Sequence, residues 1–98
     1  IADMALKIEL AKNLVYKTAW MVDNNQPLRV IPAMAKLYVT TMCQEVCDDA
    51  VQIMGGVGIM EDTRVSRLWR DARISRITGG TDEMMYKAIA PMVLAEYQ

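Results

Sequence analysis

Apolar residues recur every three or four positions along most of the chain, which is the spacing of one face of an α-helix. The first such stretch runs from Met4 to Val22, with apolar positions at Met4, Ile8, Ala11, Val15, Ala19 and Val22. Asp23 to Pro27 should end it, because Asp and Asn side chains compete for backbone hydrogen bonds and proline lacks an N–H. On its polar side, Asp3 and Lys7 are spaced for an i,i+4 ion pair.

A second helical pattern begins near Pro32 and runs to about Met54. A proline in the first turn costs little, since that amide has no partner inside the helix. The apolar arc of this helix is broad, and its members are Ala35, Val39, Met42, Cys43, Val46, Ala50 and Ile53. We therefore expect this helix to lie buried between neighbours and to form an antiparallel hairpin with the first. Gly55 and Gly56 should end it as a C-cap pair, followed by an irregular segment.

A short third helix is predicted from Thr63 or Arg64 to Arg73, with a packing face made of Val65, Leu68, Trp69 and Ala72. Arg67 and Asp71 are spaced to pair on it. Its arginines repeat every three residues and so sweep around the helix, which is not the one-sided stripe of a nucleic-acid binder. Solvated or interface-pairing arginines are favoured over phosphate binding.

The last helix should begin after Gly79 and Gly80, with Thr81 as its cap and Asp82 and Glu83 near the positive end of its dipole. Pro91 lies inside this helical pattern and is expected to kink or break the helix near Ala90. The predicted fold class is all-α, an up-down helical bundle of about four helices within one domain, residues 1–98.

Composition excludes several classes of function. Eleven basic and twelve acidic residues give a net charge of −1, without the basic surface of a nucleic-acid binder or a polybasic membrane anchor. No apolar run approaches the roughly 18 residues of a spanning helix, so we expect a soluble protein with no membrane span. Cys43 and Cys47, four apart on a predicted helix, favour buried thiols over a disulfide. With no histidine, a zinc site lacks ligands, and no metal is expected.

Two further features point beyond the chain itself. An apolar fraction of 53% is high for so small a domain, so some apolar surface is expected to meet another domain or subunit. The chain also opens inside a helical pattern, with no clear cap at Ile1 to Met4, which is typical of the tail of a longer polypeptide.

Five segments, in order, carry a family resemblance. They are Met4–Asp23, Ala33-Met34-Ala35-Lys36, Asp49-Ala50-Val51-Gln52-Ile53-Met54-Gly55-Gly56-Val57-Gly58, Arg70-Asp71-Ala72-Arg73-Ile74 and Gly80-Thr81-Asp82-Glu83. Together they resemble the C-terminal helical domain of the acyl-CoA dehydrogenases, flavoproteins that introduce an α,β double bond into acyl-CoA thioesters. The resemblance covers essentially the whole chain. It implies a fragment of a longer flavoprotein, without the first bundle helix and the upstream domains.

The resemblance also implies site residues for an FAD cofactor. A turn against FAD, held across a subunit interface, would be formed by Gln52, Ile53, Met54, Gly55 and Gly56. Thr81 and Glu83 would contact FAD from the start of the last helix, and Gly80 would lie along the acyl thioester. Local sequence alone favours plain helix termination for these residues, and the family match reverses that preference.

Gly79 occupies the position that holds the catalytic glutamate in many family members. Asp82 and Glu83 are poor replacements, because the helix dipole favours their charged forms. We therefore expect no catalytic base within the chain, a functional glutamate N-terminal to residue 1, and no activity from this fragment alone.

The function implied by the resemblance is FAD-dependent α,β-dehydrogenation of acyl-CoA thioesters by the full-length enzyme. An electron-transfer flavoprotein is the expected acceptor, and a homodimer or homotetramer is the expected assembly. The implied location is the cytoplasm of a bacterium or the mitochondrial matrix of a eukaryote. Two alternatives remain open, a non-catalytic helical interaction module and an acyl-CoA oxidase-type relative.

Overall fold

The computed structural model describes residues 1–98 as four α-helices and one short 3-10 helix. The elements are α1 (Ala2–Asp23), α2 (Ile31–Met54), η1 (Gly55–Ile59), α3 (Arg64–Ile74) and α4 (Asp82–Glu96). This confirms the predicted all-α bundle of about four helices. No helix combines the length and the apolar character needed to cross a membrane.

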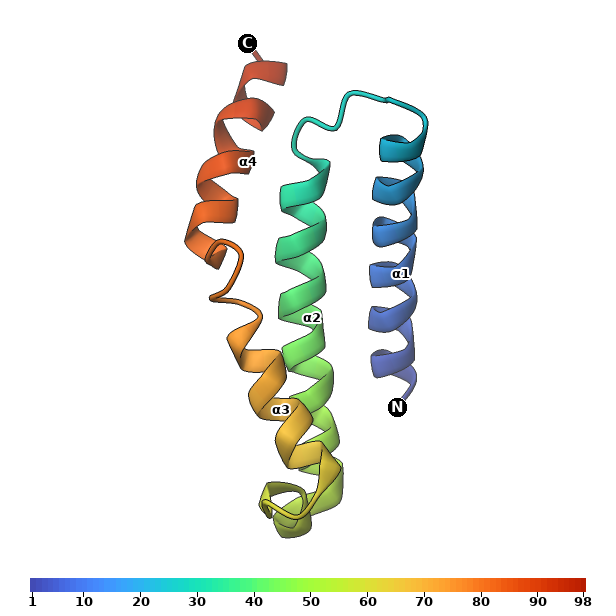
Figure 1. Ribbon diagram of the computed structural model, residues 1–98, viewed down its shortest axis with the longest axis vertical. Coiled ribbons are helices and arrows are strands. Elements are labelled where there is room, and N and C mark those ends of the chain that lie inside the picture. Colours follow the sequence, from blue (N-terminus) through green and yellow to red (C-terminus); the bar gives the residue numbers. More distant parts are fainter.

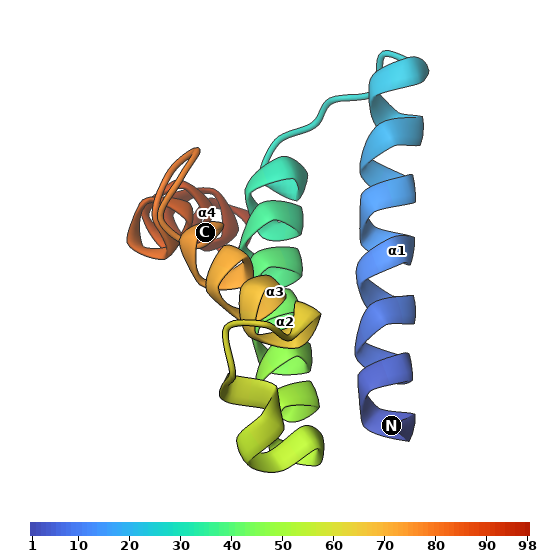
Figure 2. The ribbon, with the colours of Figure 1, turned by 60° about the horizontal axis from the view of Figure 1, so that its bottom comes forward.

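The long helix α2 is the centre of the molecule (Figure 1). α1 runs antiparallel along one side of it, while α3 and α4 follow one another along the other side. Figure 2 shows the same order from a second direction, with α2 between α1 and the other two helices. The second helix lies between neighbours as predicted, but only Ala35 and Met42 of it are buried. The result is an elongated row of helices, 50 × 24 × 23 Å, instead of a closed bundle.

The helix ends follow the local chemistry of the sequence. Pro32 lies in the first turn of α2, and Gly55, with φ 65°, follows its last residue. Thr81 caps α4 as predicted, because its Oγ1 accepts a hydrogen bond from the backbone N–H of Met84. Thr63 caps α3 in the same way. Before the cap at Thr63, Gly55 to Ile59 wind into the 3-10 turn of η1, where only an irregular segment was expected.

Of the kink or break expected near Ala90, the break is wrong. α4 continues through Pro91 to Glu96. A proline removes one backbone hydrogen bond, the one to the carbonyl four residues earlier, which belongs to Lys87. Both Pro91 and Lys87 are exposed, so water can reach that carbonyl and the helix need not end.

The details of α3 also differ from prediction. Arg67 and Asp71 do not pair, and the ion pairs nearby join Arg70 to Glu61 and Arg76 to Asp82. The packing face is also shifted. The small residues Ser66 and Ala72 are buried, whereas Leu68 and Trp69 remain partly exposed. Small side chains let α3 approach α2 closely, and its larger apolar groups lie at the edge of the contact.

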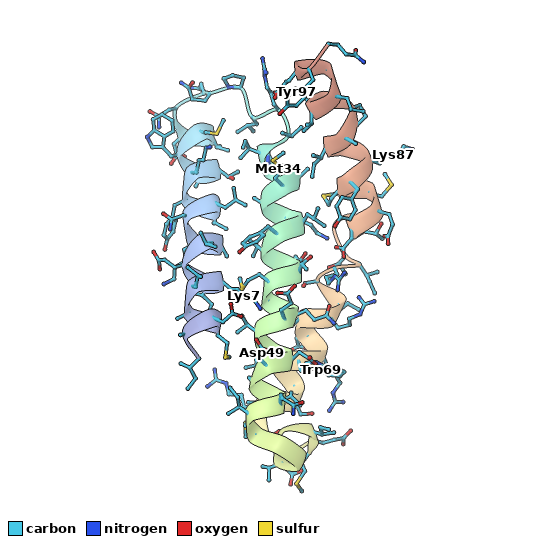
Figure 3. The ribbon with its side chains drawn as sticks, turned by 180° about the vertical axis from the view of Figure 1, so that it is seen from behind. Lys7, Met34, Asp49, Trp69, Lys87 and Tyr97 are labelled. Carbon is cyan, nitrogen blue, oxygen red and sulfur yellow. The ribbon has the colours of Figure 1, made fainter.

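One lysine links α1 to α2. The Nζ of Lys7 lies 2.9 Å from Asp3, confirming the predicted pair, and also 3.1 Å from Glu45 and 3.9 Å from Asp49 on α2. Figure 3 labels Lys7 and Asp49 on these facing helices. The hydrogen bonds that Lys7 donates to Asp3 and then to Glu45 raise the pKa of Lys7 above its ordinary value. The ammonium is therefore charged throughout the physiological range.

The core of the row is thin. Its buried apolar side chains are Ala11, Ala35, Met42 and Ala72. Large groups such as Tyr16 and Trp20 on α1 stay mostly exposed. The thiols of Cys43 and Cys47 are free and half-buried, less enclosed than expected. Such a thin core agrees with the expectation that apolar surface meets another domain or subunit, which stays a prediction.

Candidate cofactor site at two glycine turns

The first glycine turn, Gln52 to Gly58, lies where α2 ends and η1 begins (Figure 1). Gly55 adopts φ +65°, in the left-handed region that favours glycine. Gly58 is buried, and a Cβ there would lie 2.9 Å from the Val51 carbonyl oxygen. A Cβ at Gly56, as at Gly55, would meet nothing within 4 Å, and Gly56 does not have the positive φ of Gly55. The backbone at Gly56 is therefore open to an approaching group.

The side chains that were predicted to contact FAD from this turn lie in the last turn of α2, directly before that open backbone in the chain. Gln52, Ile53 and Met54 are all exposed, although two of them are large and apolar. An exposed apolar strip beside bare backbone can cover a flat ring and leave amide and carbonyl groups for its polar edge. The residues present therefore fit one face of a cofactor such as FAD.

A groove of about 420 Å³ adjoins the first glycine turn, between α2, η1 and α3. Its lining residues are Asp48, Val51, Gly58, Ile59, Glu61, Ser66, Trp69 and Arg70. Trp69, labelled in Figure 3, donates its indole N–H to Asp48 Oδ1 at 3.0 Å. Ser66 Oγ donates to the carbonyl oxygen of Ile59 at 3.3 Å. These bonds hold α3 against the end of α2 and against η1, which fixes the shape of the turn.

The second glycine turn, Thr78 to Glu83, connects the end of α3 to α4. Gly79 and Gly80 adopt φ +65° and +103° in succession, which only glycine does without strain. The Nζ of Lys36 on α2 donates a hydrogen bond to the carbonyl oxygen of Gly80. Glu83, one of the predicted FAD contacts, is exposed, and Thr81 is half-buried.

Asp82, between those two residues, is buried, with 8% of its surface exposed. Its Oδ2 accepts a hydrogen bond from Nε of Arg76 at 2.6 Å and forms an ion pair with Nη2, also at 2.6 Å. Arg76 Nη1 also donates to Gln44 Oε1 on α2 at 2.8 Å. One guanidinium therefore joins the start of α4 to the middle of α2. Asp82 Oδ1 has no partner.

The structure does not bring the two glycine turns together within one chain. The first lies at the C-terminal end of α2, after Gln52, and the second lies beside Lys36, near its N-terminal end. The rise of about 1.5 Å per residue in an α-helix separates these two points by about 24 Å. Each turn can meet a ligand, but one chain places them apart.

Sequence analysis missed the side chains that secure the second turn, Lys36, Gln44 and Arg76. Lys36 lies in one of the segments that resemble the family, and this was the one feature of the sequence that could have identified it. Arg76 had none, because its partners are 6 and 32 residues away and no local spacing rule covers them.

The geometry defines a class of protein, an all-α domain with a glycine turn at the C-terminal end of its central helix and a second one beside Lys36, near the N-terminal end. The family profile described as acyl-CoA dehydrogenase, C-terminal domain, matches residues 1–94. The chain belongs to the acyl-CoA dehydrogenase family, as the sequence resemblance indicated.

Individual similar proteins agree with this family assignment. The probable acyl-CoA dehydrogenase YdiO of Escherichia coli K12 is 50% identical over all 98 residues of this chain, which correspond to 26% of its own length. Butyryl-CoA dehydrogenase from Megasphaera elsdenii is 40% identical, with a TM-score of 0.91 over 95% of this chain and 24% of its own. A chain in a structure of the electron transferring flavoprotein of Acidaminococcus fermentans is 40% identical, with a TM-score of 0.90 over 95% of this chain and 24% of its own. The chain thus spans about a quarter of the length of these relatives.

Proposed function

We propose that this chain is the C-terminal part of an FAD-dependent acyl-CoA dehydrogenase, whose full-length form introduces the α,β double bond of acyl-CoA thioesters. Family membership supports the reaction class. The observation that carries the assignment to this chain is the open backbone at Gly56, beside the exposed Ile53 and Met54.

In this proposal, bound FAD supplies the hydride acceptor, and the chain's own residues bind and orient it. The first glycine turn, through Gln52 to Gly56, covers one part of the cofactor. Thr81 and Glu83 meet FAD from the start of α4, and Gly80 lies along the thioester. Backbone amides at the start of a helix suit anionic or polar ligand atoms.

The separation of the two turns supports an assembly of at least two copies. Because about 24 Å separates them along α2, one chain is poorly shaped to close both turns on one ligand. An interface that brings the first turn of one subunit to the FAD held by its partner removes this difficulty. We propose a homodimer or homotetramer on this ground, together with the exposed apolar side chains of α1.

Acyl-CoA is the proposed substrate, in keeping with the butyryl-CoA dehydrogenase among the similar structures. An electron-transfer flavoprotein is the proposed electron acceptor. The similar chain in the Acidaminococcus fermentans structure, which is named for an electron transferring flavoprotein, supports this partner.

The full-length protein tests the proposal. It should purify yellow or take up FAD, and anaerobic acyl-CoA should bleach the flavin band. Gly56→Leu should fold normally, because its side chain meets open space, yet weaken FAD binding by about tenfold or more, the loss expected when a close backbone contact is blocked. Met60→Leu, an exposed apolar exchange nearby, is the control and should bind FAD as the unaltered protein does.

Three results would overturn different parts of the proposal. A folded, colourless protein that cannot be reconstituted with FAD would favour the alternative of a helical interaction module. A yellow protein whose Gly56→Leu variant binds FAD as tightly as Met60→Leu would keep the reaction but remove the first glycine turn from the cofactor site. Rapid flavin reoxidation by oxygen would favour the oxidase-type relative.

A further inference from the structure

The second glycine turn connects two helices that do not contact each other. α3 and α4 both pack on α2 but not on each other, so the segment between them is not braced from either side (Figure 1). Within that segment Gly79 and Gly80 adopt two positive φ angles in succession. Glycine loses more conformational freedom on ordering than any other residue, so these two need an external constraint to hold one shape.

Two cations on either side of the turn supply that constraint. Lys36, on α2, donates to the carbonyl oxygen of Gly80, across 44 residues of chain. Arg76, just after α3, binds both Gln44 of α2 and Asp82 of α4. The lysine fixes the turn itself, and the arginine fixes the helix start that follows it.

The contacts of Lys36 and Arg76 are expected to be stronger than ordinary surface hydrogen bonds. Each is a hydrogen bond with a charged donor, and the groups involved are half-buried or buried. The Gly80 carbonyl oxygen is the acceptor, so the bond fixes the peptide plane between Gly80 and Thr81. That plane sets the direction of the Thr81 N–H, which opens α4.

We propose that Lys36 and Arg76 are positioning residues, which tie the second glycine turn to α2 and so hold Gly80, Thr81 and Glu83 in the conformation that meets thioester and flavin. The tether rests on contacts within this chain, and its role in positioning rests on the proposed function. Neither side chain need touch the cofactor. Their effect passes through the backbone of the turn.

The test uses the full-length protein and amide hydrogen exchange of the peptide covering residues 78–85. Lys36→Met keeps the aliphatic stem and removes the donor, so exchange in this peptide should rise about tenfold or more, as expected for loss of a hydrogen bond to a charged group. Lys36→Arg restores a cationic donor and should recover much of the protection. Lys12→Met, an exposed lysine on α1, is the matched control and should change nothing in this peptide.

Kinetics per bound flavin supply the second readout. If the turn is positioned by Lys36, Lys36→Met should lower kcat/KM per flavin by about tenfold, with recovery in Lys36→Arg. A merely structural lysine would lower the amount of folded enzyme and leave the rate per flavin unchanged. Hydrogen exchange needs no bound cofactor, so it tests the tether even if the protein proves not to bind FAD.

Arg76→Lys is the second variant, in case Lys36→Met does not accumulate as folded protein. A lysine keeps a positive charge near Asp82 but cannot span to Gln44 as well, so the same local rise in exchange is expected. Exchange that equals that of Lys12→Met in both folded variants would overturn the proposal. So would a rise spread evenly over all four helices.

Discussion

Arg76 compensates the buried charge of Asp82 from one side only. Its Nε and Nη2 both lie 2.6 Å from Asp82 Oδ2, while Oδ1, also buried, has no partner. No second cation approaches this carboxylate within ion-pair distance. The amides at the start of α4 add favourable dipole, because Asp82 is the first residue of that helix. The stability of this part of the fold therefore depends strongly on one guanidinium.

Removing that guanidinium should cost more than removing the pair. Arg76→Met leaves an uncompensated carboxylate in a buried place, and we expect the free energy of unfolding to fall by about 3 kcal/mol. Asp82→Asn in the same protein removes the buried charge and should recover more than half of the loss. Urea denaturation of the full-length protein measures both. Equal losses in the single and the double variant would contradict this account.

Gly58 and Gly56 should respond in opposite ways to the same substitution. Alanine at Gly58 would place its Cβ 2.9 Å from the Val51 carbonyl oxygen, which belongs to a helix and cannot shift cheaply. We expect a loss of about 2 kcal/mol, as for other overpacked sites. Alanine at Gly56 meets open space and should leave thermal stability nearly unchanged. A similar fall in Tm for both variants would show that the turn differs from the one described.

The helices were largely predictable from sequence because their signals are local. Periodic apolar residues located α1 and α2, and Thr81 marked the start of α4 by a cap that needs only its own next few residues. Of the kink or break expected at Pro91, the break was wrong, since the cost of a proline depends on whether water can reach the carbonyl it leaves free. That property belongs to the folded surface and not to the local sequence.

The site was predictable only as two separate turns. The glycines indicated where the backbone could adopt positive φ, and Gly55, Gly79 and Gly80 do so. The contacts that secure the second turn join residues far apart in the chain, such as Lys36 and Gly80, and no spacing rule reveals them. The distance between the turns also required the fold, because it follows from the straight run of α2.

The thiol of Cys47 should make stability fall at alkaline pH. Burial, with a contribution from Cys43, raises its pKa above the ordinary 9.0. In the interval between 9.0 and the raised value, the folded state holds a proton that the unfolded state has released. The contribution of Cys47 to the free energy of unfolding is therefore complete below pH 9 and is lost as the pH rises through the pKa of the thiol in the folded state.

Urea unfolding of full-length protein at pH 8 and pH 10 measures this loss. Lysines and tyrosines also titrate in the interval, so Cys47→Ala is needed as the control. The alkaline fall should be smaller in that variant than in the unaltered protein. An identical pH dependence of the two would show that Cys47 titrates as an ordinary thiol.

The last prediction concerns the base that removes the α-proton of the thioester. A base must lie within hydrogen-bond reach of that proton and be free to accept it. Gly79 has no side chain, and Asp82 is buried with its Oδ2 bound to Arg76. Glu83 is exposed at the start of α4, where water surrounds its carboxylate and competes for it, and its proposed contact is with the cofactor. No acidic group of the second glycine turn meets both conditions, so we propose a glutamate N-terminal to residue 1.

In the full-length enzyme, Glu83→Gln should therefore keep α-proton exchange, which can be followed by deuterium uptake into an acyl-CoA in D2O. Its expected effect is weaker FAD binding, since its proposed contact is with the cofactor. Replacing the upstream glutamate by Gln should abolish deuterium uptake while FAD stays bound, because only the proton acceptor is lost. Arg76→Met tests Asp82 as a base, because it removes the guanidinium that binds the Asp82 carboxylate. If freeing the Asp82 carboxylate restored uptake to the variant that lacks the upstream glutamate, or if Glu83→Gln alone abolished uptake with FAD retained, the base would lie within this chain.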